Sequence, residues 1–145
     1  MNLVNNALVL VADGKKLLFL RNHGDETRMD LHVEAHQDQL NPPTREQGTD
    51  APGRIFTGGG RRSAMEGPDY HQIAEDRFAA QAADLLRDRA LKGDFKTLVV
   101  VAPPRTLGEL RQHYHKEVAS RIAHELHKDL TGFPVEDIEA ALVRA

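Results

Sequence analysis

The sequence predicts an α/β domain in which a mixed five-stranded sheet carries helices on its faces. Three strand-like segments follow one another near the start of the chain with short connections, and such strands pair antiparallel. Later strand-like segments alternate with amphipathic helical segments, a pattern that favours parallel pairing. The 145 residues fit a single domain, 1–145, with one core.

The first two strands are predicted at residues 7–12 and 17–20, because both segments are continuously apolar. Asp13 and Gly14 between them indicate a hairpin turn. The third strand is predicted at residues 29–36, where apolar and polar residues alternate. The three segments therefore predict an antiparallel meander.

Residues 37–70 predict one long loop. Four of the seven prolines and six of the eleven glycines lie in this segment. Loops longer than about 12 to 15 residues are uncommon inside compact domains and are usually functional or disordered. The loop is therefore the first place to look for function.

The next two predicted elements are a helix at residues 71–92, ended by Gly93, and a strand at residues 97–102. The strand is apolar on both faces, which favours a central place in the sheet. A further helix is predicted to be capped by Thr106, with Glu109 completing a capping box, and to end near residue 116 or 119.

Residues 120–130 suit either a strand or a continued helix, and we predict a strand. Pro134 at a first helical position, followed by acidic residues, indicates a terminal helix. The resulting order, β-β-β-α-β-α-β-α, matches ribonuclease H-like architectures.

Composition excludes several classes of function. The chain has no cysteine, which removes disulfide scaffolds, cysteine-based zinc sites and thiol nucleophiles. A formal net charge of -3 does not suit a protein that coats nucleic acid, and no binding to DNA is expected. The longest apolar run is too short to cross a bilayer and no signal peptide precedes it, so we expect a cytoplasmic protein without membrane insertion.

The loop carries the candidate site. Consecutive glycines allow a ligand to approach the backbone closely, and guanidinium groups pair well with phosphate, so the loop suits an anion or an RNA backbone. A solvated insertion without function, a protein partner and a phosphorylated small ligand are the alternatives. The predicted anion-binding residues are Arg54, Gly58, Gly59, Gly60, Arg61 and Arg62.

These features together resemble a known family. The apolar opening strand, the glycine loop, the following helix and the strand at 97–102 resemble the middle domain of archaeo-eukaryotic class 1 release factors. More narrowly, the Leu-Gly-Glu-Leu-Arg segment at 107–111 and the Lys-Asp-Leu-Thr segment at 128–131 resemble the related bacterial host attachment proteins. The resemblance covers nearly the whole chain and implies the release-factor middle-domain fold.

The resemblance implies a stand-alone module that presents a Gly-Arg loop to RNA, with the ribosome or tRNA as partner. In release factors a Gly-Gly-Gln motif in this loop promotes hydrolysis of peptidyl-tRNA, whereas Gly58, Gly59 and Gly60 here leave no glutamine. The alternatives are an interaction protein that supports attachment to host cells, through a protein partner, and an ester hydrolase that lacks the usual glutamine.

The residues favour a binding module over an enzyme, since no catalytic set can be nominated. Asp13 is better explained by its turn than as a carboxylate that holds magnesium. The pairs His113 with His115 and His124 with His127 have spacings that metals use, but they lie among Lys and Glu residues typical of a solvated face. We therefore expect neither a metal nor a cofactor.

Overall fold

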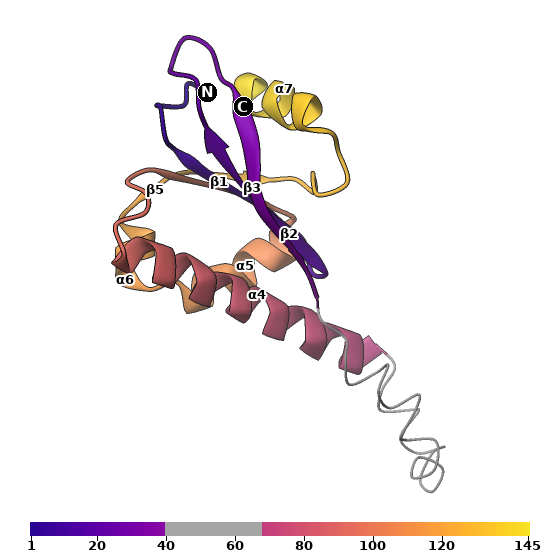
Figure 1. Ribbon diagram of the computed structural model, residues 1–145. Helices are drawn as coiled ribbons and strands as arrows, with labels where there is room; N and C mark the ends of the chain where they lie inside the picture. The colour runs from indigo at the N-terminus through magenta and orange to yellow at the C-terminus, as the bar shows by residue number, and fades with distance from the viewer. Residues whose placement is uncertain (40–67) are drawn as a thin grey trace, which may run out of the picture.

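The computed structural model describes residues 1–39 and 68–145. Its elements alternate as the sequence predicts (Figure 1). They are, in chain order, β1 (Leu8–Ala12), β2 (Lys16–Asn22), β3 (Leu31–Asp38), α4 (Pro68–Leu91), β4 (Leu98–Ala102), α5 (Pro104–His113), α6 (Lys116–Ala119), β5 (Ile122–His127) and α7 (Val135–Arg144).

The five strands form one mixed sheet in the order β3-β2-β1-β4-β5. β1, β2 and β3 pair antiparallel, and β4 pairs parallel with both β1 and β5. The predicted α/β class, the meander and the strand at residues 120–130 are therefore confirmed. β4 is wholly buried inside the sheet, as its apolar sequence predicts.

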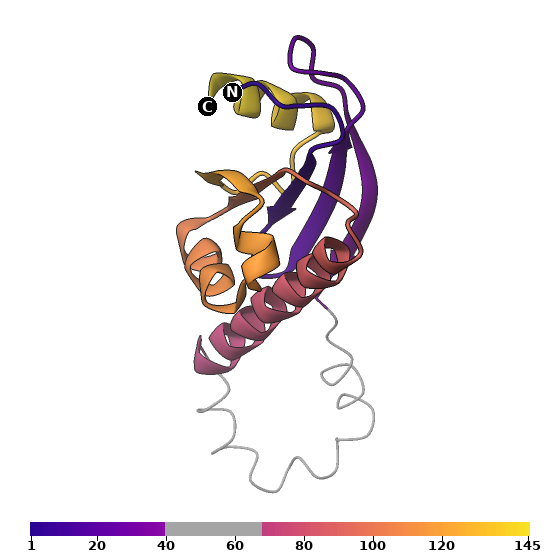
Figure 2. The same cartoon turned by 90° about the vertical axis from the view of Figure 1, so that its left-hand side faces the viewer.

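Helices cover both faces of the sheet, so the molecule has three layers (Figures 1 and 2). Alternate residues of β1 face opposite sides: Leu8 and Leu10 pack with α4, α5 and α6, whereas Val9 and Val11 pack with α7. Every residue of β1 is buried because both faces are covered. Helices therefore cover the two faces of the sheet, and the strands begin and end at the two ends of the sheet that the helices leave open.

The third strand departs from the predicted strict alternation. Between β2 and β3 the register shifts, so that Phe19 faces Ala35 and Leu20 faces Val33, leaving Glu34 as an extra residue. Ala35 then packs in the core under α4, whereas Val33 is 44% exposed. A bulge of one residue reverses which face each later side chain takes, which period-2 reasoning does not anticipate.

Two helix boundaries also differ from the predictions. α5 begins two residues before Thr106, with Pro103 as its N-cap residue and no side-chain cap, so the predicted capping box is absent. The helix also ends at His113, and α6 is separate because His115 is extended and its ring nitrogen Nδ1 accepts the Glu117 backbone N–H at 3.0 Å. The predicted stop at Gly93 is confirmed by its left-handed φ of 71°.

Candidate functional site at the carboxyl end of the sheet

Four of the five strands run in the same direction. β3 is antiparallel to β2, which is antiparallel to β1, so β3 points the same way as β1, β4 and β5. Their carboxyl ends therefore share one end of the sheet, and the segment 40–67 follows the carboxyl end of β3 (Figure 1). Open α/β sheets bind ligands at the carboxyl ends of their strands.

Asp13, directly after β1, organises this end. Its Oδ1 accepts the backbone N–H groups of Lys15 and Lys16, each at 2.7 Å, which closes the hairpin turn to β2. Its Oδ2 accepts the Thr131 hydroxyl at 2.8 Å. The predicted role of Asp13 in the turn is confirmed. The structure also shows a hydrogen bond that connects this turn to Thr131, in the segment after β5.

Both flanks of the long loop contact this turn. Gln39, the last described residue before the loop, donates from Nε2 to the Gly14 carbonyl at 3.0 Å. Glu75, on the second turn of α4, packs so closely that a β-carbon on Gly14 would lie 2.6 to 2.7 Å from its side-chain atoms. A side chain at position 14 would therefore require the Glu75 side chain to move.

The predicted anion-binding residues lie outside the described residues. The structure places only the flanks of their segment, at the turn that Asp13 organises. Their role in binding stays a prediction. These residues are Arg54, Gly58, Gly59, Gly60, Arg61 and Arg62.

Four exposed cations surround the same end of the sheet. Lys15 lies in the turn after β1, Lys16 begins β2, Arg105 follows β4, and Lys128 follows β5. Within residues 1–39 and 68–145 none of them forms an ion pair, whereas Arg21, Arg87, Arg89, Arg111 and Arg121 all do. Sequence reasoning missed this group, although each cation lies within four residues of a strand's carboxyl end.

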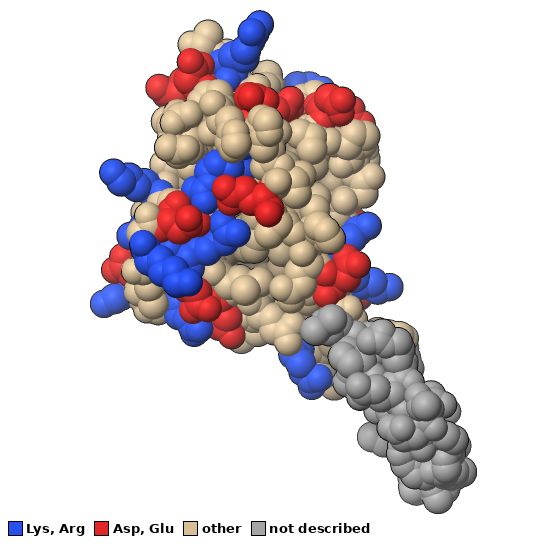
Figure 3. Space-filling model, viewed as in Figure 1, with Lys and Arg blue, Asp and Glu red and all other residues tan. Residues whose placement is uncertain are grey.

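Acidic residues accompany these cations, so the end of the sheet is not uniformly positive. Asp38 closes β3 and Asp129 follows Lys128, and both are exposed. Asp129 Oδ1 lies 2.9 Å from the Thr131 hydroxyl oxygen, and thus Asp129 belongs to the tie around Asp13. On the face shown in Figure 3, positive and negative side chains are also intermingled.

At the opposite end of the sheet Arg21 is buried and fully paired. Its Nε and Nη2 bind the two carboxylate oxygens of Glu34 at 3.0 and 3.2 Å. Its remaining N–H groups bind the carbonyls of Asn6 and Asp94 and the Asp94 carboxylate, at 2.9 to 3.2 Å. All five guanidinium donors are therefore used within the protein, so this arginine is structural.

The network around Arg21 shifts the pKa of both partners. Burial alone would lower the pKa of Arg21 and raise that of Glu34, because it disfavours charge. The hydrogen bonds and opposite charges outweigh burial, so the pKa of Arg21 is raised and that of Glu34 is lowered. Arg89 completes the network, bound to Glu34 and Asp94 at 3.0 Å each and stacked over the Phe19 ring.

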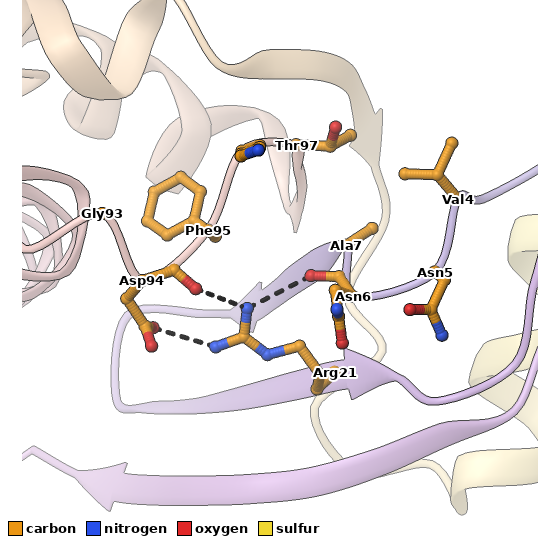
Figure 4. A pocket seen from close by; sticks show the side chains of 10 residues that line it. Val4, Asn5, Asn6, Ala7, Arg21, Gly93, Asp94, Phe95 and Thr97 are labelled. Atoms are coloured by element: carbon orange, nitrogen blue, oxygen red, sulfur yellow. Dashed lines mark hydrogen bonds and ion pairs between the residues drawn. The ribbon is translucent and has the colours of Figure 1, made fainter.

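A pocket of 580 Å³ opens beside Arg21, between the segment before β1 and the segment before β4 (Figure 4). Asn6, Asp94, Lys96 and Thr97 are among the residues that line it. Sequence reasoning missed this pocket because its walls come from segments about 90 residues apart.

The two motifs of the narrower resemblance have structural roles. Leu107 and Leu110 of α5 are buried in the core, and Arg111 pairs with Glu125 of β5. Leu130 is buried under α7, next to Thr131 in its tie to Asp13.

The histidine pairs form no metal cluster. His113 lies 3.5 Å from Glu109, and His115 caps α6. Within the described part of the chain, no group of three or more potential ligands can hold a metal ion.

The described residues define an α/β domain whose strands β1, β3, β4 and β5 end together, where ligands commonly bind. The family model described as bacterial archaeo-eukaryotic release factor family 12 matches residues 6–142, and the chain belongs to this family. The narrower resemblance to host attachment proteins stays a prediction.

Among solved structures, the chain is similar to the archaeal translation termination factor aRF1. The identity is 10% and the TM-score 0.47, and the match covers 95% of this chain and 41% of the archaeal one, so the chain spans less than half of that protein. A comparison with curated proteins finds no match. No described helix is long and apolar enough to span a membrane.

Proposed function

We propose that this release-factor-like domain binds RNA of the ribosome or tRNA through the carboxyl end of its sheet and the predicted loop that follows β3 in the sequence. The observation that carries the proposal is a group of cations without an ion pair among residues 1–39 and 68–145, at the end of the sheet where β3 finishes. They are Lys15, Lys16, Arg105 and Lys128. Membership of a bacterial release-factor family supports this choice of partner. The proposal places the protein in the cytoplasm.

Unpaired cations favour a polyanionic partner for a physical reason. A guanidinium already bound to carboxylates, such as Arg21, has no free donor and little net field. No carboxylate of the described residues pairs with the four cations at the carboxyl end, which leaves their donors for phosphate oxygens, and Arg54, Arg61 and Arg62 of the predicted loop add three more cations. Phosphate contacts of this kind supply most non-specific affinity for nucleic acid.

The proposal is a binding function rather than a reaction. Gly58, Gly59 and Gly60 stand where release factors carry Gly-Gly-Gln, so the amide of that motif is missing. Asp13, the carboxylate at the end of β1, is committed to two backbone N–H groups and the Thr131 hydroxyl. A peptide-release assay with loaded ribosomes, run on the protein and on Gly60→Gln, tests the hydrolase alternative directly.

The deciding experiment is ribosome co-sedimentation over a series of salt concentrations. Changing Arg54, Arg61 and Arg62 together to Ala is expected to weaken association. Each lost phosphate contact lowers the slope of log affinity against log salt by roughly 0.7 to 0.9. The matched control removes three cations at the opposite end of the sheet, Arg28, Lys92 and Lys116, which have no ion pair within the described residues.

The control separates a specific surface from general charge. If both triple variants lose association equally, binding follows net charge and the proposed surface is wrong. If neither triple variant loses association with the ribosome, the hypothesis that the loop binds RNA is wrong. The alternative, attachment through a protein partner, is then favoured.

A further inference from the structure

The pocket beside Arg21 exists because two parallel strands separate at their amino ends. β1 and β4 are paired from Leu8 and Leu98 onward. One residue before Ala7, Asn6 adopts a left-handed φ of 68°, a conformation that asparagine tolerates better than most residues. The backbone there turns towards β2, where the Asn6 N–H donates to the Asn22 carbonyl at 2.8 Å.

Arg21 interrupts the hydrogen-bond ladder at this point. The Thr97 carbonyl accepts the Leu8 N–H at 2.9 Å, so the Thr97 backbone groups face β1. In a continued parallel ladder the Thr97 N–H would donate to the Asn6 carbonyl. That carbonyl instead accepts Arg21 Nη1 at 3.2 Å (Figure 4).

The Thr97 N–H is therefore left without a partner among the described residues, at the wall of the pocket. Thr97 is only partly exposed, and a backbone N–H that is shielded from water without a partner costs free energy. A ligand with an acceptor oxygen would supply the missing hydrogen bond.

Other donors line the same pocket. The Lys96 ammonium and the Asn6 side-chain amide have no hydrogen bond or ion pair within residues 1–39 and 68–145, and both residues line the pocket. Among the charged residues that line the pocket, Arg21 and Lys96 are positive and Asp94 is negative. The local charge therefore favours an anion over a cation.

We propose that this pocket binds a small molecule through an oxyanion group, either a carboxylate or a phosphate. The oxyanion accepts the Thr97 N–H, the Asn6 amide and the Lys96 ammonium, while the saturated Arg21 holds the walls in place. The volume of 580 Å³ lies in the range of ordinary small-molecule sites. This site is independent of the proposed RNA surface, because it lies at the amino ends of β1 and β4 rather than the carboxyl ends.

Amide NMR tests the proposal on the whole protein, with inorganic phosphate and acetate as probes at constant ionic strength. We expect the Thr97 amide proton to shift downfield in a saturable way and its hydrogen exchange to slow. The probe with the larger saturable shift identifies the source of the oxyanion. Lys96→Ala is expected to weaken binding about tenfold, since it removes a charge-assisted hydrogen bond.

Two further variants distinguish a direct contact from an effect on folding or on general charge. Asn6→Gly retains the left-handed backbone and removes only the amide, so a weaker shift with unchanged folding supports a direct contact. Lys92→Ala removes a nearby lysine that does not line the pocket, and we expect it to leave binding unchanged. The proposal is overturned if the Thr97 amide responds to neither probe, or if Lys92→Ala and Lys96→Ala weaken binding equally.

Discussion

Arg21 at one end of the sheet and the cations at the other end use their charge in opposite ways. At the amino end of β1, Arg21 donates all five of its N–H groups, to two carboxylates and two carbonyls. At the carboxyl end, Lys15, Lys16, Arg105 and Lys128 contact no carboxylate among the described residues. The difference separates positive charge that holds the fold together from positive charge that is free to meet a partner.

The largest expected effect comes from Arg21→Ala. The change leaves Glu34 and Asp94 without their shared buried partner and the Asn6 carbonyl without its donor. We expect the free energy of unfolding in urea to fall by about 2 kcal/mol, in line with the loss of hydrogen bonds to charged groups, since both carboxylates are partly exposed and keep Arg89. The control is Arg28→Ala, which removes an exposed arginine that forms no ion pair within the described residues, and it is expected to change stability by less than about 0.5 kcal/mol.

Asp13→Ala is expected to have the next largest effect, because it removes the acceptor for two turn N–H groups and for Thr131. A loss of about 1 to 2 kcal/mol in the free energy of unfolding is expected from hydrogen bonds to a charged group. Asp13→Asn keeps one acceptor oxygen and is expected to lose less. Equal losses in the two variants would contradict the hydrogen-bond account.

The pH dependence of stability tests the Arg21 network at the amino end of β1. The pKa of Glu34 is lowered in the folded protein, since its hydrogen bonds and ion pairs with Arg21 and Arg89 outweigh burial. A lowered pKa means that this stabilisation is present above the ordinary value of 4.5 and is lost as the pH falls through the folded value. Urea midpoints measured from pH 7 to pH 3 check this.

Glu34→Gln is the matched variant for the acid experiment. It removes the titrating group, so the fall in stability below pH 4.5 is expected to be shallower than in the unchanged protein. An identical fall in both proteins would assign acid sensitivity to other carboxylates.

The smallest effect on stability is expected at the carboxyl end. Changing Lys15, Lys16, Arg105 and Lys128 together to Ala removes no ion pair within the described residues, so we expect a change below about 0.5 kcal/mol. The same variant is expected to weaken ribosome co-sedimentation and to flatten its salt dependence. A strong loss of stability instead would mean that these cations belong to the fold, and the contrast between the two ends would disappear.

Sequence patterns predicted most of the fold because they report local burial. The apolar runs of β1 and β4 and the glycine after α4 each have one physical explanation, and the structure confirms them. The capping box at Thr106 was wrong because Pro103 and Pro104 already begin the helix. The uninterrupted helix beyond His113 was wrong because His115 caps a new one.

The candidate site was only partly predictable. Sequence reasoning found Asp13 in its turn and selected the loop, whose residues lie outside the described ones. It missed Thr131 as the partner of Asp13, because 118 positions separate the two side chains. It also missed the pocket beside Arg21, where a single long side chain replaces one rung of a ladder.

By itself the sequence determined the fold class, the order of the elements and the segment richest in glycine and arginine, because these depend on periodicity and composition along the chain. The tertiary structure alone decided which arginine is buried with all its donors bound and, among the described residues, which lysines form no ion pair and that the Thr97 N–H has no partner. These features depend on contacts between residues that lie far apart in the sequence, and sequence patterns do not show which distant residues come into contact.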